Sequence, residues 1–138
     1  YFEATWFHAA MDGFEVFEVG GIRLGVQLCT ELMFNERSRA YGRAGAELIV
    51  APRASSASTR RWLTAGAMAA LVSGCYVVSS NRAGRTAAGQ VFGGTAFAFQ
   101  PDGEPLAQTS DTESIVVIEV DPARARAQQS LYPCYVRE

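Results

Sequence analysis

The chain has 138 residues, of which 49% are hydrophobic, so it can bury one modest core and fits a single domain or part of one. A formal charge of -2 at pH 7 provides no basic field for a nucleic-acid backbone. No apolar run approaches the roughly 20 residues that a membrane span requires. We therefore expect a soluble protein whose partner is a small molecule or another protein, not a nucleic acid and not a membrane.

Three cysteines stand at wide spacing, at Cys29, Cys75 and Cys134. They form no CxxC pair, and the single histidine, His8, leaves no histidine pair to complete a zinc site. An odd number of cysteines at such spacing favours free thiols in a reducing compartment, so we expect a cytoplasmic location and no bound metal. All 12 basic residues are arginines, and lysine is absent from the chain.

In the first third of the chain, strand-favouring runs precede and follow one polar helix. Gly20-Gly21 separates two such runs and suits the tight turn of a hairpin, because its turn types need positive φ. Asn35 is a good N-cap type, and Gly45 ends the polar segment that it opens. Pro52 closes an apolar run typical of a buried strand. In chain order, the predicted elements are strands at 14–19 and 22–28, a helix at 35–44 and a strand at 47–51.

The rest of the chain continues this alternation. A helix rich in alanine and leucine ends at Gly74, and Pro122 suits the first turn of a last helix. The segment 101–104 has the composition of a turn. In chain order, the predicted elements are a helix at 59–73, a strand at 76–80, a loop at 81–94, strands at 95–100, 105–108 and 115–120, and a helix at 122–129. Strands alternating with helices and hairpins predict an α/β fold with a mixed sheet.

Cys29 stands between a predicted strand and a polar turn that leads into a helix. A strand-to-helix junction can present a nucleophile beside outward-pointing backbone N–H groups. Free cysteine is also among the most buried residue types, so placement alone equally allows a small hydrophobic residue at a strand end. Ser79 and Ser80 lack the Gly-x-Ser-x-Gly elbow, which argues against a serine hydrolase.

The residues around Cys29 resemble the nucleophile region of nitrilase-superfamily carbon–nitrogen hydrolases. In that family, a strand ending in cysteine is followed by an acidic residue two positions on, an aromatic-Pro-Glu, an arginine, and a Gly-Ala-Asp/Glu before an apolar strand closed by proline. Segments 25–36 and 44–52 follow this order, with Asn35 in place of the usual proline. The resemblance continues through 74–84, 92–95, 101–104 and 119–121. Ala69 and Ser73 depart from the arginine and asparagine common in the family.

The resemblance implies a nitrilase-like fold, part of a four-layer α-β-β-α sandwich with a mixed sheet. Residues 1–138 would be the C-terminal portion of a single carbon–nitrogen hydrolase domain whose N-terminal portion is absent. The first residue, Tyr1, is not methionine, which favours a missing natural N-terminus. We expect the uncovered strand faces to associate with a complementary N-terminal segment or with other copies in a homo-oligomer.

By resemblance, Cys29 is the catalytic nucleophile, and the backbone N–H of Thr30 contributes to the oxyanion hole. Glu3 matches a glutamate that helps to position the family's lysine and substrate, although it could instead be an exposed carboxylate near a frayed terminus. The family's base glutamate and its lysine would precede Tyr1. This chain therefore carries a nucleophile without its activating partners, and we expect the isolated chain to be inactive.

Six further residues have expected roles near the nucleophile. Glu31 and Glu36 are expected to hold the turn after Cys29 through hydrogen bonds and an ion pair to Arg39. Arg53 occupies a pocket-lining position in the resemblance and could bind a substrate carboxylate, although a solvated loop arginine fits equally well. Phe34, with Met33, could wall the pocket or simply pack.

The function that the resemblance implies is hydrolysis of a non-peptide C–N bond through a cysteine thioester, without metal or organic cofactor. An amide or N-carbamoyl substrate is expected before a nitrile. The first alternative is a catalytically inactive remnant that binds partners through its exposed sheet. The second is a thiol-redox protein using Cys29, which the lack of a nearby resolving cysteine disfavours.

Overall fold

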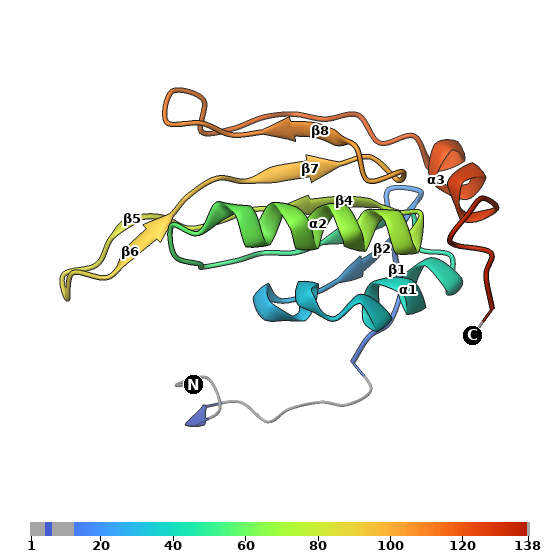
Figure 1. Ribbon diagram of the computed structural model, residues 1–138, viewed down its shortest axis with the longest axis horizontal. Coiled ribbons are helices and arrows are strands. Elements are labelled where there is room, and N and C mark those ends of the chain that lie inside the picture. The colour runs from blue at the N-terminus through green and yellow to red at the C-terminus, as the bar shows by residue number, and fades with distance from the viewer. Residues whose placement is uncertain (1–4, 7–12, 138) are drawn as a thin grey trace.

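The computed structural model describes residues 5–6 and 13–137, so the prediction for Glu3 lies outside the described residues. Helices and strands follow one another along the chain much as the sequence indicates (Figure 1). In chain order, the elements are β1 (Phe17–Val19), β2 (Ile22–Val26), the 3-10 helix η2 (Cys29–Met33), α1 (Asn35–Arg43), β3 (Leu48–Val50), α2 (Thr59–Ser73), β4 (Tyr76–Ser79), β5 (Ala83–Arg85), β6 (Val91–Gly93), β7 (Phe97–Phe99), β8 (Pro105–Gln108) and α3 (Pro122–Gln129).

Six strands form one mixed sheet in the order β1-β2-β3-β4-β7-β8. The central strands β2, β3 and β4 run parallel, and the outer pairs are antiparallel. The register aligns Val26 with Val50 and Val50 with Val78, so the three parallel strands end at the same edge. The predicted α/β fold with a mixed sheet is confirmed.

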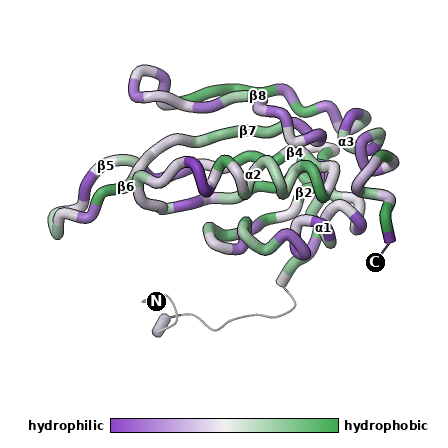
Figure 2. The backbone as a smooth tube through the Cα atoms, viewed as in Figure 1, coloured by the Kyte–Doolittle hydropathy of each residue, from purple (hydrophilic) through white to green (hydrophobic). Residues whose placement is uncertain are grey.

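The hydrophobic core lies between this sheet and helices α1 and α2, which cover one face (Figure 1). Alternate strand residues point into it, because successive side chains of a strand face opposite sides. Figure 2 shows hydrophobic residues along the strands and polar residues in the turns. The buried members of the core are Leu32, Tyr41, Ala46, Ile49, Ala51, Ala65, Ala69, Ala70, Cys75, Val77, Phe97 and Phe99.

Glycine allows α1 and α2 to pack closely. A Cβ added to Gly42 would lie 2.1 Å from the carbonyl oxygen of Ser73, at the end of α2. Backbone contact at that distance excludes any side chain at position 42. The close approach brings α1 and α2 together as one layer in front of the sheet.

The opposite face of the sheet is apolar and only partly covered by the described residues. Leu24, Val26 and Val50 are half-buried there, while Phe17 is 46% and Val19 is 59% exposed. Neither α1 nor α2 lies on this face (Figure 1). A face of this composition is typical of a layer that packs against a second one.

The prediction of a paired strand at 115–120 is wrong for the described residues. The segment contributes side chains from Val116 and Ile118 to a cavity of about 240 Å³ on the uncovered face, together with Val50 and Val78. Ile115 is 79% and Val117 is 93% exposed, and the segment joins neither sheet. The alternation in the sequence indicates a strand, but a strand also needs a partner edge, which the described residues do not supply.

The predicted loop at 81–94 contains a short hairpin, which is a second correction. β5 and β6 pair antiparallel, with Gly84 opposite Phe92, and extend beyond the end of the main sheet (Figure 1). Glycine and arginine hide the strand pattern in this segment, since neither residue favours a strand. None of the helices in the described part of the chain has the length and apolar character needed to cross a bilayer.

Candidate active site

The carboxyl ends of the three parallel strands bring polar residues together at one edge of the sheet. Cys29 follows β2, Arg53 follows β3 and Asn81 follows β4. Cys29 N–H donates to the Pro52 carbonyl at 3.0 Å, and Arg53 N–H donates to the Ser80 carbonyl at 3.0 Å. The carboxyl ends of parallel strands are where α/β sheets place ligands and reacting groups.

Cys29 itself occupies a sharp turn from strand to helix. Its φ of 49° lies in the left-handed region, which a residue with a side chain adopts at a cost of roughly 1–3 kcal/mol. The thiol is free and half-buried, and the residue opens η2. A strained junction of this kind is typical of a nucleophile presented at the top of a sheet.

Glu31 forms two hydrogen bonds in the turn after Cys29. Its carboxylate Oε2 accepts a hydrogen bond from Leu28 N–H at 2.6 Å, on the residue just before Cys29. Its backbone carbonyl accepts from Gln27 Nε2 at 3.2 Å. Gln27 is fully buried and accepts in turn from Ser38 Oγ at 3.0 Å, which ties η2 to α1.

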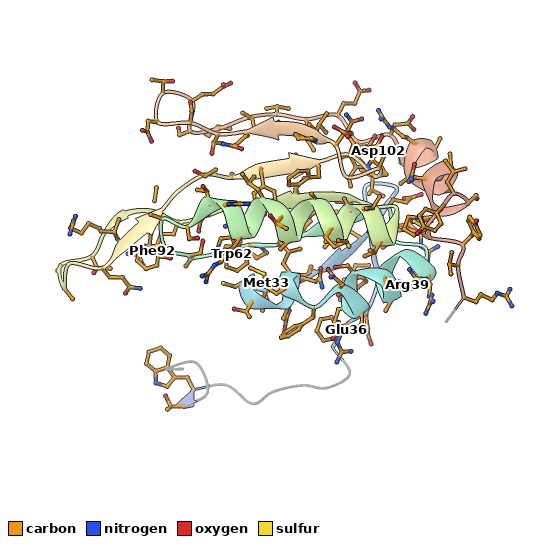
Figure 3. All side chains as sticks on the ribbon, in the orientation of Figure 1. Met33, Glu36, Arg39, Trp62, Phe92 and Asp102 are labelled. Carbon is orange, nitrogen blue, oxygen red and sulfur yellow. The ribbon has the colours of Figure 1, made fainter. Side chains whose placement is uncertain are left out.

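The expected ion pair to Arg39 is not formed by Glu31 or Glu36 among the residues that the structure describes. Arg39 Nη2 donates instead to the Val136 carbonyl in the C-terminal segment. Glu36 is exposed in the first turn of α1, where a carboxylate is favoured by the helix dipole. Figure 3 shows Glu36 and Arg39 at different points along α1, away from the start of η2.

Phe34 and Met33 follow Cys29 in the chain and lie at the surface. Phe34 is 47% exposed and Met33 is 37% exposed. Met33 lines a cavity of about 440 Å³ between η2 and α2 together with Ala65 and Met68, and Cys29 does not line it. Their role as walls of a substrate pocket remains a prediction.

Arg53 is a buried cation at the same edge of the sheet. It is 7% exposed, and three of its nitrogen atoms donate inside the fold. Nε donates to Ser79 Oγ at 2.6 Å, Nη1 to Ser55 Oγ at 3.1 Å and Nη2 to the Thr95 carbonyl at 2.8 Å. The guanidinium group therefore joins the segment after β3, the end of β4 and the segment before β7.

Two aromatic rings enclose the same guanidinium group. Its central carbon lies 4.9 Å from the ring centre of Trp62 on α2 and 4.8 Å from that of Phe97 on β7. Within the described residues no carboxylate forms an ion pair with it. Burial lowers the pKa of Arg53 to about 10, and the negative charge of the Cys29 thiolate opposes this lowering. Binding of a substrate carboxylate by Arg53 remains a prediction.

Two polar residues to which the sequence analysis assigns no role, Asn81 and Ser55, complete this edge. Asn81 Oδ1 accepts from Ser55 N–H at 2.9 Å, and Asn81 Nδ2 donates to the Gly94 carbonyl. An asparagine directly after the carboxyl end of a buried strand is the signal that could have identified it. Its side-chain amide joins the segment after β3 to the segment before β7.

The other two cysteines lie away from this edge. Cys75 is fully buried, and its Sγ donates to the Ala46 carbonyl at 3.0 Å. Burial raises the pKa of Cys75 to about 12, so the thiol is protonated and unreactive near neutral pH. Cys134 lies in the C-terminal segment near Leu71. No group of three or more metal-binding side chains forms among residues 5–6 and 13–137.

Comparison with known proteins relates the chain to one family. The family model described as carbon-nitrogen hydrolase matches residues 1–129. The chain is 30% identical over 119 residues to deaminated glutathione amidase of Escherichia coli O157:H7, covering 84% of this chain and 44% of that protein. It spans about half the length of the curated relatives that it matches, between 41% and 61% for those with the strongest matches.

Solved structures share the fold. A carbon-nitrogen hydrolase from Helicobacter pylori G27 matches 96% of this chain and 52% of its own, with a TM-score of 0.84 and 24% identity. A mutant of the amidase from Nesterenkonia sp. AN1, described with acrylamide added at the active site cysteine, matches 74% of this chain and 40% of its own. Its TM-score is 0.67 and its identity 25%.

Proposed function

The chain belongs to the carbon-nitrogen hydrolase family, and from this premise we propose that it carries the nucleophile of an enzyme that hydrolyses a non-peptide C–N bond. The substrate is an amide or an N-carbamoyl compound before a nitrile, a preference that the names of the amidase relatives favour. The observation that carries the proposal is the strained, half-buried Cys29 at the carboxyl edge of β2.

In the proposed reaction, the Cys29 thiolate attacks the carbonyl carbon of the amide. The resulting oxyanion accepts a hydrogen bond from the backbone N–H of Thr30, the residue after the nucleophile. The C–N bond then breaks, the leaving amine takes up a proton, and a thioester remains on Cys29. Water attacks the thioester, which releases a carboxylic acid and regenerates the thiol.

A thiolate and one N–H group are not a complete catalytic set. The reaction also needs a base to form the thiolate and an acid to protonate the leaving amine. By resemblance the base glutamate and the lysine precede this chain, and the chain itself contains no lysine. Glu3 is proposed as a second glutamate that positions the lysine and the substrate. We therefore expect the chain to be inactive alone and active within a longer protein.

Exposed apolar side chains at and beside the uncovered face of the sheet support the proposal of a partner that covers it. Val19 of β1 is 59% exposed, and Val117, in the segment 115–120 beside this face, is 93% exposed, although residues of this type gain about 1.5–3 kcal/mol from full burial. A complementary N-terminal segment on this face would complete a four-layer α-β-β-α sandwich. A second copy of the chain is the other proposed occupant.

The test compares the natural gene product with its Cys29→Ala variant on a panel of small amides, N-carbamoyl amino acids and nitriles. Hydrolysis by the natural protein that the variant lacks would support the proposal. Hydrolysis that survives Cys29→Ala would contradict it. The chain expressed alone is expected to show no turnover in either form.

A catalytically inactive interaction module is the second candidate, and the exposed apolar face of the sheet is the observation that favours it. If the natural gene product has the length of this chain and no activity on the panel, this second function replaces the first. Co-purification of a defined partner that protects Val117 from solvent would then support it.

A further inference from the structure

Arg53 is a charged side chain in the protein interior, where burying a charge is energetically unfavourable. A buried cation normally has a carboxylate partner, because its desolvation costs several kcal/mol. Arg53 has polar neutral partners instead, namely two serine hydroxyls and one carbonyl oxygen. The rings of Trp62 and Phe97 limit movement out of the guanidinium plane. The side chain is therefore held in one position by contacts in several directions.

This fixed group is linked to Cys29 through the backbone of one residue. Pro52 directly precedes Arg53, and its carbonyl accepts the N–H of Cys29 at 3.0 Å. The backbone N–H of Arg53 is bonded to Ser80 on the other side. A shift of the Arg53 backbone would displace the adjoining Pro52 carbonyl, and with it the hydrogen bond that holds the turn at Cys29. The negative charge of the Cys29 thiolate also opposes the lowering of the Arg53 pKa by burial, so the two charges attract one another.

We propose that Arg53 is a positioning residue for the Cys29 nucleophile, which it acts on through the Pro52 carbonyl and through its fixed positive charge. The inference rests on the proposed function and assigns Arg53 a role in the chemical step rather than in substrate binding. It replaces the expectation that Arg53 binds a substrate carboxylate. The internal hydrogen bonds and the 7% exposure favour the positioning role.

The two roles predict different kinetics. A positioning residue affects the reaction of every substrate, so its loss lowers kcat while KM for a neutral amide stays nearly constant. A carboxylate ligand affects only anionic substrates, so its loss raises KM for an anionic amide and leaves a neutral amide unchanged. The reactivity of the Cys29 thiol toward iodoacetamide provides a readout that requires no substrate.

The experiment uses the natural gene product with Arg53→Met, Arg53→Ala and Arg53→Lys, and Arg61→Met on exposed α2 as the matched control. We expect Arg53→Met to lower kcat for a neutral amide by about tenfold or more and to change KM by less than about twofold. Iodoacetamide modification of Cys29 at pH 7 should slow by about threefold or more, because fewer molecules hold a correctly placed thiolate. For Arg53→Lys, kcat and the alkylation rate should lie between those of the wild type and Arg53→Met. Lysine keeps the positive charge but lacks the planar guanidinium group that forms several hydrogen bonds at once.

Added guanidinium ion at a non-denaturing concentration should restore part of the Cys29 reactivity in Arg53→Ala and leave the control unchanged. A folded Arg53→Met with wild-type kcat and wild-type Cys29 alkylation would overturn the inference. So would a loss confined to KM for anionic amides, which would restore the carboxylate-binding role. If the Arg53 variants fail to fold, Ser55→Ala replaces them, and an alkylation rate equal to that of the wild type would overturn the inference.

If the wild type hydrolyses none of the tested substrates, the proposed function is contradicted, but this inference is not. The alkylation comparison between the wild type and the Arg53 variants still decides the role of Arg53 in that case. Cys29→Ser serves as the blank for alkylation at this site.

Discussion

The backbone N–H of Cys29 donates to the Pro52 carbonyl at 3.0 Å, which extends the pairing of β2 and β3 beyond both strands to the candidate nucleophile. The bond fixes the first residue of η2 at the strand edge, while φ of 49° turns the chain sharply away from the sheet. Cys29 is thus held by the strand on one side and by the helix on the other.

Replacing Gly42 by alanine should destabilise the fold. The new Cβ would lie 2.1 Å from the Ser73 carbonyl oxygen, so α1 and α2 must separate. We expect a loss of roughly 1–3 kcal/mol in the free energy of unfolding, as for other overpacked contacts. Urea denaturation measures it, with exposed Ala40→Ser on the same helix as the control. Equal stability of the two variants would contradict the close packing of α1 on α2.

Replacing Arg126 by methionine should lower the free energy of unfolding more than replacing Arg124 by methionine. Arg126 bonds to Glu47, whose side chain is only 4% exposed, whereas Arg124 pairs with Asp102 at the surface. Without Arg126 the buried Glu47 carboxylate keeps the backbone N–H of Arg23, 3.0 Å away, as a donor. We expect a loss of roughly 1–3 kcal/mol for Arg126→Met and under about 1 kcal/mol for Arg124→Met.

Thermal or urea unfolding of both variants at low and moderate salt checks this difference. The effect of Arg124→Met should shrink further with salt, because exposed charges are screened. A larger loss for Arg124→Met than for Arg126→Met would show that the Glu47 contact does not contribute as its burial indicates.

Stability should fall as the pH rises above about 9, and Cys75 should contribute to the fall. Burial raises the pKa of Cys75 from 9.0 to about 12 in the folded chain. The folded state therefore binds more protons than the unfolded state between these values, and the contribution present below pH 9 is lost as the pH rises toward 12. Denaturation midpoints at pH 8 and pH 10 measure the fall, which Cys75→Ala should reduce.

The same burial predicts the order in which the cysteines react. Iodoacetamide at pH 8 should modify Cys29 well before Cys75 in the folded protein, because the thiolate is the reacting form. Peptide mapping after a short exposure gives the two rates, and exposure in urea provides the unfolded control. Equal rates in the folded protein would mean that Cys75 is not enclosed as the structure describes.

Val117→Lys should have opposite consequences in the chain alone and in a longer natural protein. Val117 is 93% exposed in this structure, so in the isolated chain the substitution should change stability by less than about 0.5 kcal/mol. If a complementary segment covers this face, the same substitution buries a charge and should cost about 2 kcal/mol or more. Unfolding of both forms measures it, with exposed Ser114→Lys as the control.

Much of the sheet could be predicted from the sequence, because its elements have strong local signals. The helix Thr59–Ser73 and the strand Pro105–Gln108 begin and end at the predicted residues, since a glycine stop and a turn sequence mark their boundaries. Segment 115–120 was mispredicted because its alternation reports a tendency to form a strand, while pairing depends on an edge elsewhere. The β5–β6 hairpin was missed because its glycines and arginine give no strand signal.

For the candidate site, the sequence indicates the positions of residues along the chain but not their long-range contacts. Cys29 and Glu31 could be placed by pattern, because both lie in one continuous segment next to a strand. The partners of Arg39 and Arg53 depend on contacts between residues far apart in the chain, such as Arg39 with Val136 and Arg53 with Thr95. Local spacing cannot determine such contacts, so these hydrogen bonds could not be predicted from the sequence.

The most direct test of the central claim is the intact mass of the natural gene product quenched in acid during turnover of an amide, followed by peptide mapping. We expect an increase in mass equal to the acyl group of the substrate, located on the peptide that contains Cys29 and absent in Cys29→Ala. Turnover without such an adduct, with equal rates for the wild type and Cys29→Ala, would contradict a thioester at Cys29.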